Sequence, residues 1–321
     1  MDQLRIVFMG TPEFAVQSLD VLIRNNYNVV GVVTMPDKPA GRGLQLQQSD
    51  VKKYALDKGL TILQPEKLKE ESFLDQLRAL KADLQIVVAF RMLPEVVWNM
   101  PRLGTINLHG SLLPQYRGAA PINWAIINGE KETGVTTFFL QHQIDTGKII
   151  FREKTQIGEN DTAGEIHDRL MNIGAELILK TIRSIEKGVY PQIDQSEFVA
   201  ENEEIKHAPK IFKEDCKIDW RKPLNEIHNL IRGLSPYPAA FTEFISPDDK
   251  IHPVKIFIER MEAETHHYFI PSIVTDSKKQ LKIAVKGGYI DILELQVAGK
   301  KRLSVVEFLR GFQINSEWKI N

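Results

Sequence analysis

Three polar residues near the middle of the chain could act together on one carbonyl group. Asn107 and His109 are two positions apart in the segment 105–109, and Asp145 begins an Asp-Thr-Gly triplet further along the chain. If the segment is a strand, its side chains alternate between two faces, so Asn107 and His109 share one face. Open α/β sheets place ligands at the carboxyl ends of their strands, where this pair would lie. The three residues are therefore predicted to form one site.

The chemistry of these groups favours acyl transfer. An amide such as that of Asn107 donates hydrogen bonds without ionising, which suits the stabilisation of an oxyanion. A histidine such as His109 can move a proton near neutral pH. The carboxylate of Asp145 could accept from the far ring nitrogen, fix the tautomer and favour the charged ring. Because no Ser, Cys or Lys in these motifs looks like a covalent nucleophile, we expect direct attack of an amine on an activated carbonyl.

Each of these features has a simpler interpretation when taken alone. An Asn-x-His pair on a strand is more often a satisfied polar edge than a catalyst, and Asp-Thr-Gly is usually a tight turn. The combination is what favours a functional site. His142 is an alternative imidazole because it lies three residues before Asp145, but its Gln-His-Gln setting predicts a surface loop.

The first half of the chain alternates strand-like and helical patterns. Thr11–Pro12 predicts a capped helix start, and Thr162 with Glu165 predicts a capping box for a long helix that Gly188 ends. Buried strands are predicted at residues 4–9, 28–34, 84–90 and 105–109. The alternation predicts the α/β class, with a doubly wound, Rossmann-like and mostly parallel sheet.

The length of 321 residues exceeds a typical domain of roughly 100 to 200 residues, so two domains are expected. We assign residues 1–190 to the catalytic domain and residues 191–209, with an acidic cluster, to a linker. Residues 210–321 contain several short strand-like runs separated by turn signals, which predict a small β-barrel. The segment 35–48 is predicted to be a long loop that acts as a substrate clamp.

Composition narrows the location and the chemistry. The longest apolar runs are shorter than the ~18 residues of a membrane span, and the first residues lack a signal pattern, so a cytoplasmic protein is expected. Cys216 is the single cysteine, and the histidines lack a metal-ligand spacing, so no metal is expected. The net charge of -1 is not the overall basic excess of a nucleic-acid binder.

The chain resembles the folate-dependent formyltransferases, and within that family the enzymes that formylate initiator methionyl-tRNA. The resemblance covers nearly the whole chain. The segments that carry it are LRIVFMGTPEFAVQSLDVL, MPDKPAGRG, INLHGSLLPQYRGAAPINWAI, ETGVTTFF with IDTG, KIDW and AGKK. The Asn, His and Asp are common to the wider family and define the chemistry, whereas MPDKPAGRG, YRGAAPI and AGKK narrow the acceptor.

The resemblance implies roles for individual residues. Asn107, His109 and Asp145 fall in the catalytic set, and the formyl donor is 10-formyltetrahydrofolate. The folate-binding residues would be Ser111, Leu112, Leu113, Pro114 and Phe90. The family usually reads Ala-Tyr-Gly-x-x-Leu-Pro beside the pterin; here the segment 89–94 is one residue shorter and lacks that glycine, so a reshaped pocket wall is expected.

The resemblance also implies a nucleic-acid partner, the acceptor arm of initiator methionyl-tRNA. Arg42 falls where the family has an arginine that meets the acceptor end, and the C-terminal barrel is expected to be OB-like. Since the chain has no overall basic excess, the tRNA surface must be a local patch, for which Lys210, Lys300 and Lys301 are candidates. The protein is expected to act as a monomer without a membrane partner.

Three alternative functions remain at this point. A related formyltransferase could act on a small amine, such as a purine precursor or an amino-sugar nucleotide, and would lack the steep salt dependence of tRNA binding. A Rossmann-like dehydrogenase is disfavoured because Gly10-Thr11-Pro12 is not a G-x-G-x-x-G fingerprint. A non-catalytic RNA-binding protein on the same scaffold would not need its Asn, His and Asp.

Overall fold

The computed structural model describes residues 3–40 and 45–321 of the chain. It divides into two compact units. Unit 1 contains Met1–Gly118, Glu132–Thr155 and His167–His207, and unit 2 contains Ala119–Lys131, Gln156–Ile166 and Ala208–Asn321. The predicted division into residues 1–190, 191–209 and 210–321 stays a prediction.

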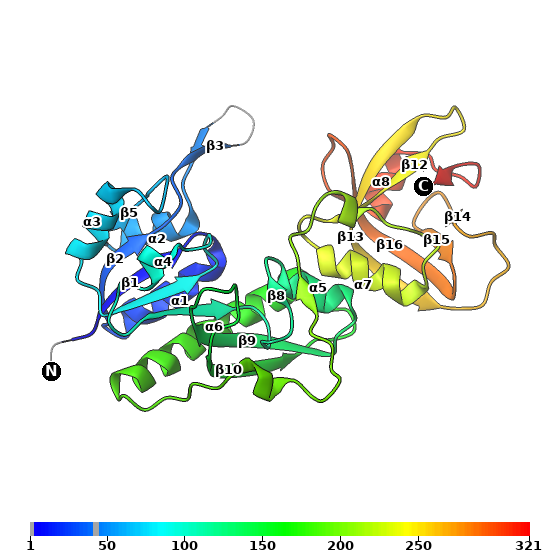
Figure 1. The fold of residues 1–321 in the computed structure, drawn as a ribbon. Helices are drawn as coiled ribbons and strands as arrows, with labels where there is room; N and C mark the ends of the chain where they lie inside the picture. The colour runs from blue at the N-terminus through cyan, green and yellow to red at the C-terminus, as the bar shows by residue number, and fades with distance from the viewer. Residues whose placement is uncertain (1–2, 41–44) are drawn as a thin grey trace. The chain divides into compact units, whose positions relative to one another are not determined.

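Within the described residues, unit 1 is built on a sheet of seven strands. Figure 1 shows this sheet, with β1, β2, β9 and β10 among its labelled strands. The strand order is β10-β9-β7-β6-β1-β2-β5. The strands are β1 (Arg5–Gly10), β2 (Asn28–Val33), β5 (Ile62–Leu63), β6 (Leu84–Val88), β7 (Thr105–His109), β9 (Glu132–Phe139) and β10 (Ile149–Gln156). Five of them, β5, β2, β1, β6 and β7, pair in parallel, and β9 pairs antiparallel with β7. Their apolar runs are buried, as expected of parallel strands covered on both faces.

The order of the strands reverses beside β1. The chain leaves β1 for β2 on one side of the sheet, while β6 and then β7 lie on the other side. Because these strands are parallel, their carboxyl ends, which include Gly10, Val88 and His109, lie at one edge of the sheet. A crevice at such a reversal is where α/β sheets bind ligands.

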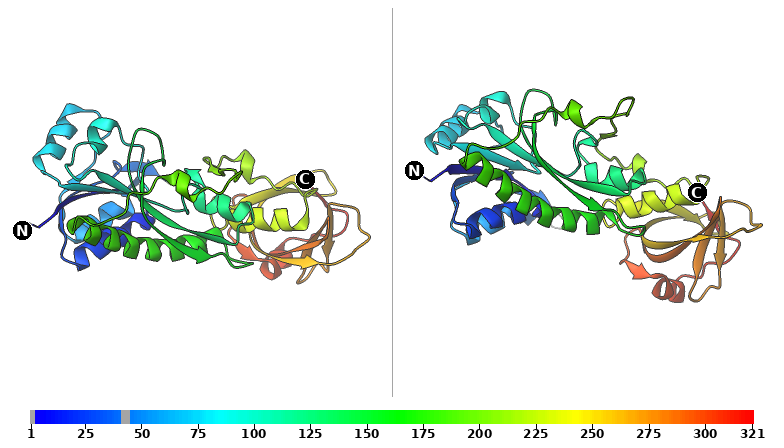
Figure 2. Two further views of the ribbon diagram at one scale, coloured as in Figure 1. Left: turned by 60° about the horizontal axis from the view of Figure 1, so that its bottom comes forward. Right: turned by 90° about the horizontal axis from the view of Figure 1, so that it is seen from below.

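The helices of this sheet follow the predicted pattern. They are α1 (Glu13–Arg24), α2 (Asp50–Asp57), α3 (Glu71–Ala79), α4 (Glu95–Trp98) and α6 (Ala163–Glu186). Figure 2 shows α6 running alongside the strands, where Thr181 of α6 shares a 2.9 Å hydrogen bond with Thr137 of β9. The predicted capping box is confirmed by two reciprocal hydrogen bonds. Glu165 N–H donates to the Thr162 hydroxyl oxygen at 3.3 Å, and Thr162 N–H donates to the Glu165 carboxylate at 2.8 Å.

Two local predictions are wrong. Helix α1 begins at Glu13 with Pro12 at the N-cap position, so Thr11 does not cap it. The Thr11 hydroxyl is instead buried without a hydrogen-bond partner among the residues that the structure describes. The segment 35–48 is not a plain loop, because β3 (Lys38–Ala40) and β4 (Gln45–Gln47) pair within it as an antiparallel hairpin. Because β3 contains Pro39 and neither strand alternates apolar and polar residues over a useful length, the sequence pattern does not predict this hairpin.

Unit 2 is a small antiparallel barrel. Its strand order is β14-β15-β16-β13-β12-β18, with β17 paired to β16, and the end strands β14 and β18 contact each other, which nearly closes the sheet. The strands are β12 (Ala240–Ile245), β13 (Ile251–Ala263), β14 (Ser272–Thr275), β15 (Leu281–Val285), β16 (Gly288–Val297), β17 (Leu303–Ser304) and β18 (Lys319–Ile320). The predicted fold class, a doubly wound α/β sheet followed by a small barrel, is confirmed.

Helices α5 (Pro121–Ile127), α7 (Leu224–Leu234) and α8 (Val305–Gly311) complete unit 2. Helix α7 packs on α5 and on β13, and its residues Ile227 and Ile231 belong to the apolar core of the barrel. The remaining elements of the described residues are β8 (Arg117–Gly118), β11 (His207–Ala208), η1 (Gln195–Phe198) and η2 (Glu214–Cys216).

Candidate active site

Strand β7 brings Asn107 and His109 to the carboxyl edge of the sheet. The two apolar residues that alternate with them, Ile106 and Leu108, are 0% and 3% exposed. Leu108 lies against Gly174 of α6, so this face of the strand is closed by the helix. The pleat therefore directs the two polar side chains to the opposite face, as the alternation predicts.

The imidazole of His109 lies between a backbone carbonyl and a carboxylate. Its Nε2 is 2.9 Å from the carbonyl oxygen of Tyr116, and its Nδ1 is 3.9 Å from Oδ2 of Asp145. Both side chains are nearly buried, at 8% and 11% exposure. Since a carbonyl only accepts, Nε2 must carry the proton, which leaves Nδ1 as the basic atom of the neutral ring. The carbonyl of Tyr116, and not Asp145, therefore fixes the tautomer.

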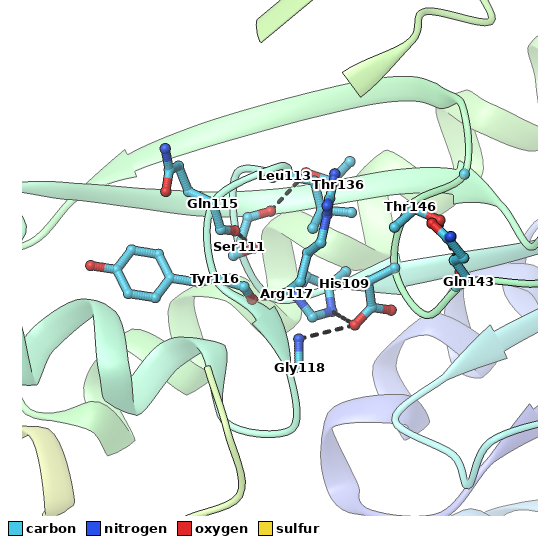
Figure 3. Close-up of polar contacts among 12 residues, drawn as sticks. His109, Ser111, Leu113, Gln115, Tyr116, Arg117, Gly118, Thr136, Gln143 and Thr146 are labelled. Atoms are coloured by element: carbon cyan, nitrogen blue, oxygen red, sulfur yellow. Dashed lines mark hydrogen bonds and ion pairs between the residues drawn. The ribbon is translucent and has the colours of Figure 1, made fainter. Parts of the chain in front are cut away.

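The Asp145 carboxylate is held in place by the backbone. Gly118 N–H donates to its Oδ2 at 3.0 Å, and the same oxygen is 3.9 Å from Nδ1 of His109. Figure 3 labels His109 and Gly118 on either side of this contact. Asp145 has a φ of 54°, in the left-handed region that aspartate tolerates better than most residues. The 3.9 Å separation from His109 is too long for a hydrogen bond but leaves a strong charge interaction with a protonated ring.

Arg117 interacts electrostatically with the Asp145 carboxylate. Burial lowers the pKa of the Arg117 guanidinium, and the charge of Asp145 opposes that shift. Arginine remains charged in proteins, so the guanidinium is a permanent counter-charge at this edge of the site. Its side chain donates to Gln195, a buried residue to which the sequence patterns assigned no role.

Asn107 differs from its neighbours because its amide is uncommitted. The side chain is partly buried, and within residues 3–40 and 45–321 its amide makes no hydrogen bond. An amide without a hydrogen-bond partner of its own can donate to an oxygen that gains charge during a reaction. Asn107, His109 and Asp145 thus lie together at one edge of the sheet, while their catalytic roles stay predictions.

The segment after His109 is fixed by its own hydrogen bonds. The Ser111 hydroxyl donates to the Gln115 carbonyl at 2.6 Å, and Thr136 Oγ1 donates to the Ser111 carbonyl at 2.7 Å and accepts from Leu113 N–H at 3.1 Å (Figure 3). Ser111 and Leu113 are both 0% exposed. Of the predicted folate residues in this segment, Leu112 alone has a partly exposed side chain. The segment can therefore meet a ligand through its backbone and through Leu112.

Phe90 lies just past the end of β6 and packs partly against the apolar core of unit 1. The Arg91 guanidinium lies 5.6 Å from the centre of the Phe90 ring and donates to the carbonyls of Pro65 and Glu66. This anchored arginine follows Phe90 directly, at the step where the family pattern has glycine. Arg91 therefore ties the segment after β6 to residues 65 and 66.

The predicted tRNA-binding residues are spread over the chain. Arg42 lies outside the described residues. Lys210, Lys300 and Lys301 belong to unit 2 and are exposed. The Lys210 ammonium lies 5.5 Å from the ring of Phe212, and Lys300 and Lys301 follow β16 in a turn closed by the bond from Lys300 N–H to the Val297 carbonyl.

The described residues contain neither a candidate metal site nor a candidate membrane-spanning helix. No group of three or more His, Cys, Asp or Glu residues there could hold a metal ion. No helix there has the length and apolar content needed to cross a bilayer. The alternative imidazole, His142, is 74% exposed and pairs with Glu95 at 3.5 Å, as expected of a surface loop.

Comparison with known proteins agrees with this geometry. The formyl transferase family model matches residues 4–182, and the model of the formyl transferase C-terminal domain matches residues 210–313. A methionyl-tRNA formyltransferase of Bacteroides thetaiotaomicron is 56% identical over 320 residues, with 100% of this chain and 99% of the relative covered. One of Parabacteroides distasonis is 57% identical, with 99% of each chain covered.

Solved structures share the fold at low identity. An N-formyltransferase from Helicobacter canadensis, in complex with folinic acid and dTDP-3-aminofucose, superposes with a TM-score of 0.67 at 22% identity, covering 94% of this chain and all of that one. HypX from Aquifex aeolicus, in complex with tetrahydrofolic acid, has a TM-score of 0.64 at 17% identity, covering 98% of this chain and 49% of that one. By the matches over its whole length, the chain belongs to the formyl transferase family, among the methionyl-tRNA formyltransferases.

Proposed function

We propose that this chain transfers the formyl group of 10-formyltetrahydrofolate to the α-amino group of methionine on initiator methionyl-tRNA, for translation initiation. The observation that carries the proposal is the site itself. The Asn107 amide, which makes no hydrogen bond to any residue that the structure describes, shares one strand face with the His109 imidazole, and the Asp145 carboxylate lies 3.9 Å from that imidazole. These are the groups needed to stabilise an oxyanion and to move a proton in acyl transfer.

Asn107 and His109 hold the oxyanion that forms on the formyl oxygen. Asn107 donates from its amide, which has no hydrogen-bond partner in the described part of the chain, and His109 donates from Nδ1 when the ring is protonated. Nε2 cannot take this part because the Tyr116 carbonyl occupies it at 2.9 Å. Asp145 faces Nδ1 and stabilises the positive ring by charge attraction.

The proton balance follows from these positions. The amine nitrogen forms a bond to the formyl carbon, and the bond from that carbon to the tetrahydrofolate nitrogen breaks. His109 gives its Nδ1 proton to the leaving nitrogen, and the proton lost from the attacking amine restores the ring. One proton thus moves from the attacking to the leaving nitrogen, and no acyl-enzyme forms.

The residues present fit a folate as formyl donor, which supplies the activated formyl carbon when bound. The segment Ser111–Pro114, which directly follows the β7 site, would hold it through its backbone and Leu112, with Phe90 along the wall. Backbone groups and apolar surface of this kind are what bind flat, polar-edged rings. The Phe90 wall is pinned by Arg91, so we expect a pterin pocket of fixed shape.

Recognition of the tRNA is assigned to local basic groups. We propose that Arg42 in the segment 35–48 meets the acceptor end, and that Lys210, Lys300 and Lys301 contact phosphates. An Arg42→Ala variant should weaken catalysis on charged tRNA and leave donor binding intact; equal loss of both would remove the clamp hypothesis. We further propose that the chain acts as a monomer in the cytoplasm.

One experiment decides between the acceptors. The purified protein is given the formyl donor together with methionyl-tRNA, a purine-precursor amine and an amino-sugar nucleotide, and the formylated product is identified. Formylation of methionyl-tRNA alone, with a KM that rises steeply with salt, is the expected result. Formylation of either small amine in preference to methionyl-tRNA would contradict the proposed acceptor and leave the proposed chemistry intact.

A further inference from the structure

Gln195 is a buried residue whose side-chain amide binds Arg117 and the backbone of the turn that contains Asp145. It begins η1, in a segment that the sequence predicts to be a linker, yet its side chain is only 5% exposed. A buried glutamine is uncommon unless its polar atoms are paired. The partners of Gln195 therefore identify what its burial serves.

The amide of Gln195 uses both of its ends. Its Oε1 accepts from Nε and Nη2 of Arg117 at 3.0 Å and 2.6 Å. Its Nε2 donates to the carbonyl oxygens of Asp145 and Gly147 at 2.8 Å and 2.9 Å. A guanidinium only donates and a carbonyl only accepts, so the amide has one possible orientation.

These contacts close a ring around Asp145. Arg117 precedes Gly118, whose N–H donates to the Asp145 carboxylate at 3.0 Å. The Nε2 end of Gln195 therefore binds the backbone of the Asp145 turn. Its Oε1 end binds Arg117, which is adjacent in the chain to the Gly118 that binds the Asp145 carboxylate. Asp145 adopts a left-handed backbone conformation, with φ of 54°, which persists only where the surroundings hold it.

We infer that Gln195 is a positioning residue for formyl transfer, which sets the place of the Asp145 carboxylate beside His109. The inference rests on the role proposed above for Asp145. The essential groups are the two N–H donors of the amide, because they restrain the turn that carries the carboxylate. A residue that keeps the Arg117 contact but lacks these donors must lose the effect.

Two substitutions separate these contributions. Gln195→Ala removes every contact. Gln195→Glu keeps the length and the acceptors for Arg117, but places oxygens that only accept against the carbonyls of Asp145 and Gly147. We expect both variants to lower kcat about 10- to 100-fold, because a misplacement near 1 Å has that effect, while KM for methionyl-tRNA and donor stays within about twofold.

A matched control lies next in the chain. Asp194 pairs with Lys148 at 3.8 Å, with both side chains about half exposed, and so joins the same two segments without touching the turn carbonyls. Asp194→Asn should leave kcat unchanged, since exposed ion pairs contribute little. Circular dichroism and melting curves give the folded fraction to which each kcat is normalised. A Gln195→Glu protein with wild-type kcat would overturn the inference.

A double-substitution cycle tests the route of the effect. If Gln195 acts through the carboxylate, Gln195→Ala should lower kcat by less than about twofold in an Asp145→Asn background. A full, multiplicative loss in that background would overturn the inference and leave the role of Asp145 intact. If Asp145→Asn alone left kcat unchanged, the proposed role of Asp145 would fail, and the positioning role with it.

Discussion

Gly147 allows the Asp145 turn to approach strand β9 more closely than any side chain would permit. A Cβ atom at this position would lie 1.7 Å from the carbonyl oxygen of Phe139 and 3.1 Å from a ring carbon of Phe138. Ordinary contact requires roughly 3.5 Å, so Gly147→Ala must open the gap to Phe139 by about 1.8 Å. The close contact is with backbone, which cannot rotate away.

The turn is the part that must move. Phe139 is paired with Ile106 of β7 inside the sheet, whereas Gly147 lies in a turn held by a few hydrogen bonds. Since Asp145 is two residues from Gly147, its carboxylate should shift relative to His109 by more than 1 Å. A shift of that size costs about 100-fold in rate, or about 2.7 kcal/mol of transition-state stabilisation.

We therefore expect Gly147→Ala to lower kcat/KM for methionyl-tRNA formylation at least about 100-fold. The crowding should also lower the free energy of unfolding by about 1 to 3 kcal/mol, as overpacking does. Formylation is measured with labelled donor on the folded fraction, and unfolding is followed in urea. Gly311→Ala is the control, because no described residue outside its own helix turn lies within 4 Å of the added carbon. A folded Gly147→Ala protein within about threefold of wild-type kcat/KM would refute the reasoning.

Three further predictions concern other parts of the molecule. Asn107→Ala should lower kcat about 10²- to 10³-fold at saturating substrates, as loss of an oxyanion donor does, while an unchanged kcat would exclude that role. Burial alone would lower the pKa of His228, but the hydrogen bond and charge of Glu259 outweigh it and raise the pKa. The charged pair therefore stabilises the fold below a pH of about 6.5, and this stabilisation is lost as pH rises through the raised pKa of His228. The difference in unfolding free energy between wild type and His228→Gln, measured by urea titration, should therefore shrink from pH 6 to pH 9. A Lys300→Glu, Lys301→Glu double variant should raise KM for tRNA and make that KM less dependent on salt, while KM for the donor stays unchanged. A matching rise in KM for the donor would contradict a tRNA contact.

Much of the sheet could be predicted from the sequence because its signal is local. The range 105–109 is the strand that the structure contains, and the Thr162–Glu165 capping box begins α6 as predicted. Apolar runs and capping residues act within a few positions of themselves, so their pattern survives without knowledge of the fold. The predicted strand 84–90 ends early, at Val88, because a terminal apolar residue such as Phe90 can also pack from a loop.

The contacts that orient the predicted catalytic groups leave no such signal. The carbonyl of Tyr116 and the amide N–H of Gly118 are backbone groups that any residue type carries. Gln195 lies in a segment with no apolar period, so its burial follows only from tertiary structure. The sequence could therefore predict which side chains meet, but not what holds them.

Two residues beside His109 have strained backbone conformations, which lower the stability of the fold. Tyr116 and Asp145 both adopt left-handed conformations, with φ of 61° and 54°, and each supplies a group that faces the His109 ring. Such conformations cost about 1 to 3 kcal/mol each and persist only where neighbours over-determine them. Each conformation is held by a hydrogen bond with a residue distant in sequence: Tyr116 N–H donates to the Lys206 carbonyl at 2.7 Å, and Gln195 Nε2 donates to the Asp145 carbonyl at 2.8 Å. The two left-handed residues therefore present two groups to the ring: a carbonyl at 2.9 Å from Nε2 that fixes the tautomer, and a carboxylate at 3.9 Å from Nδ1 that stabilises the charged form.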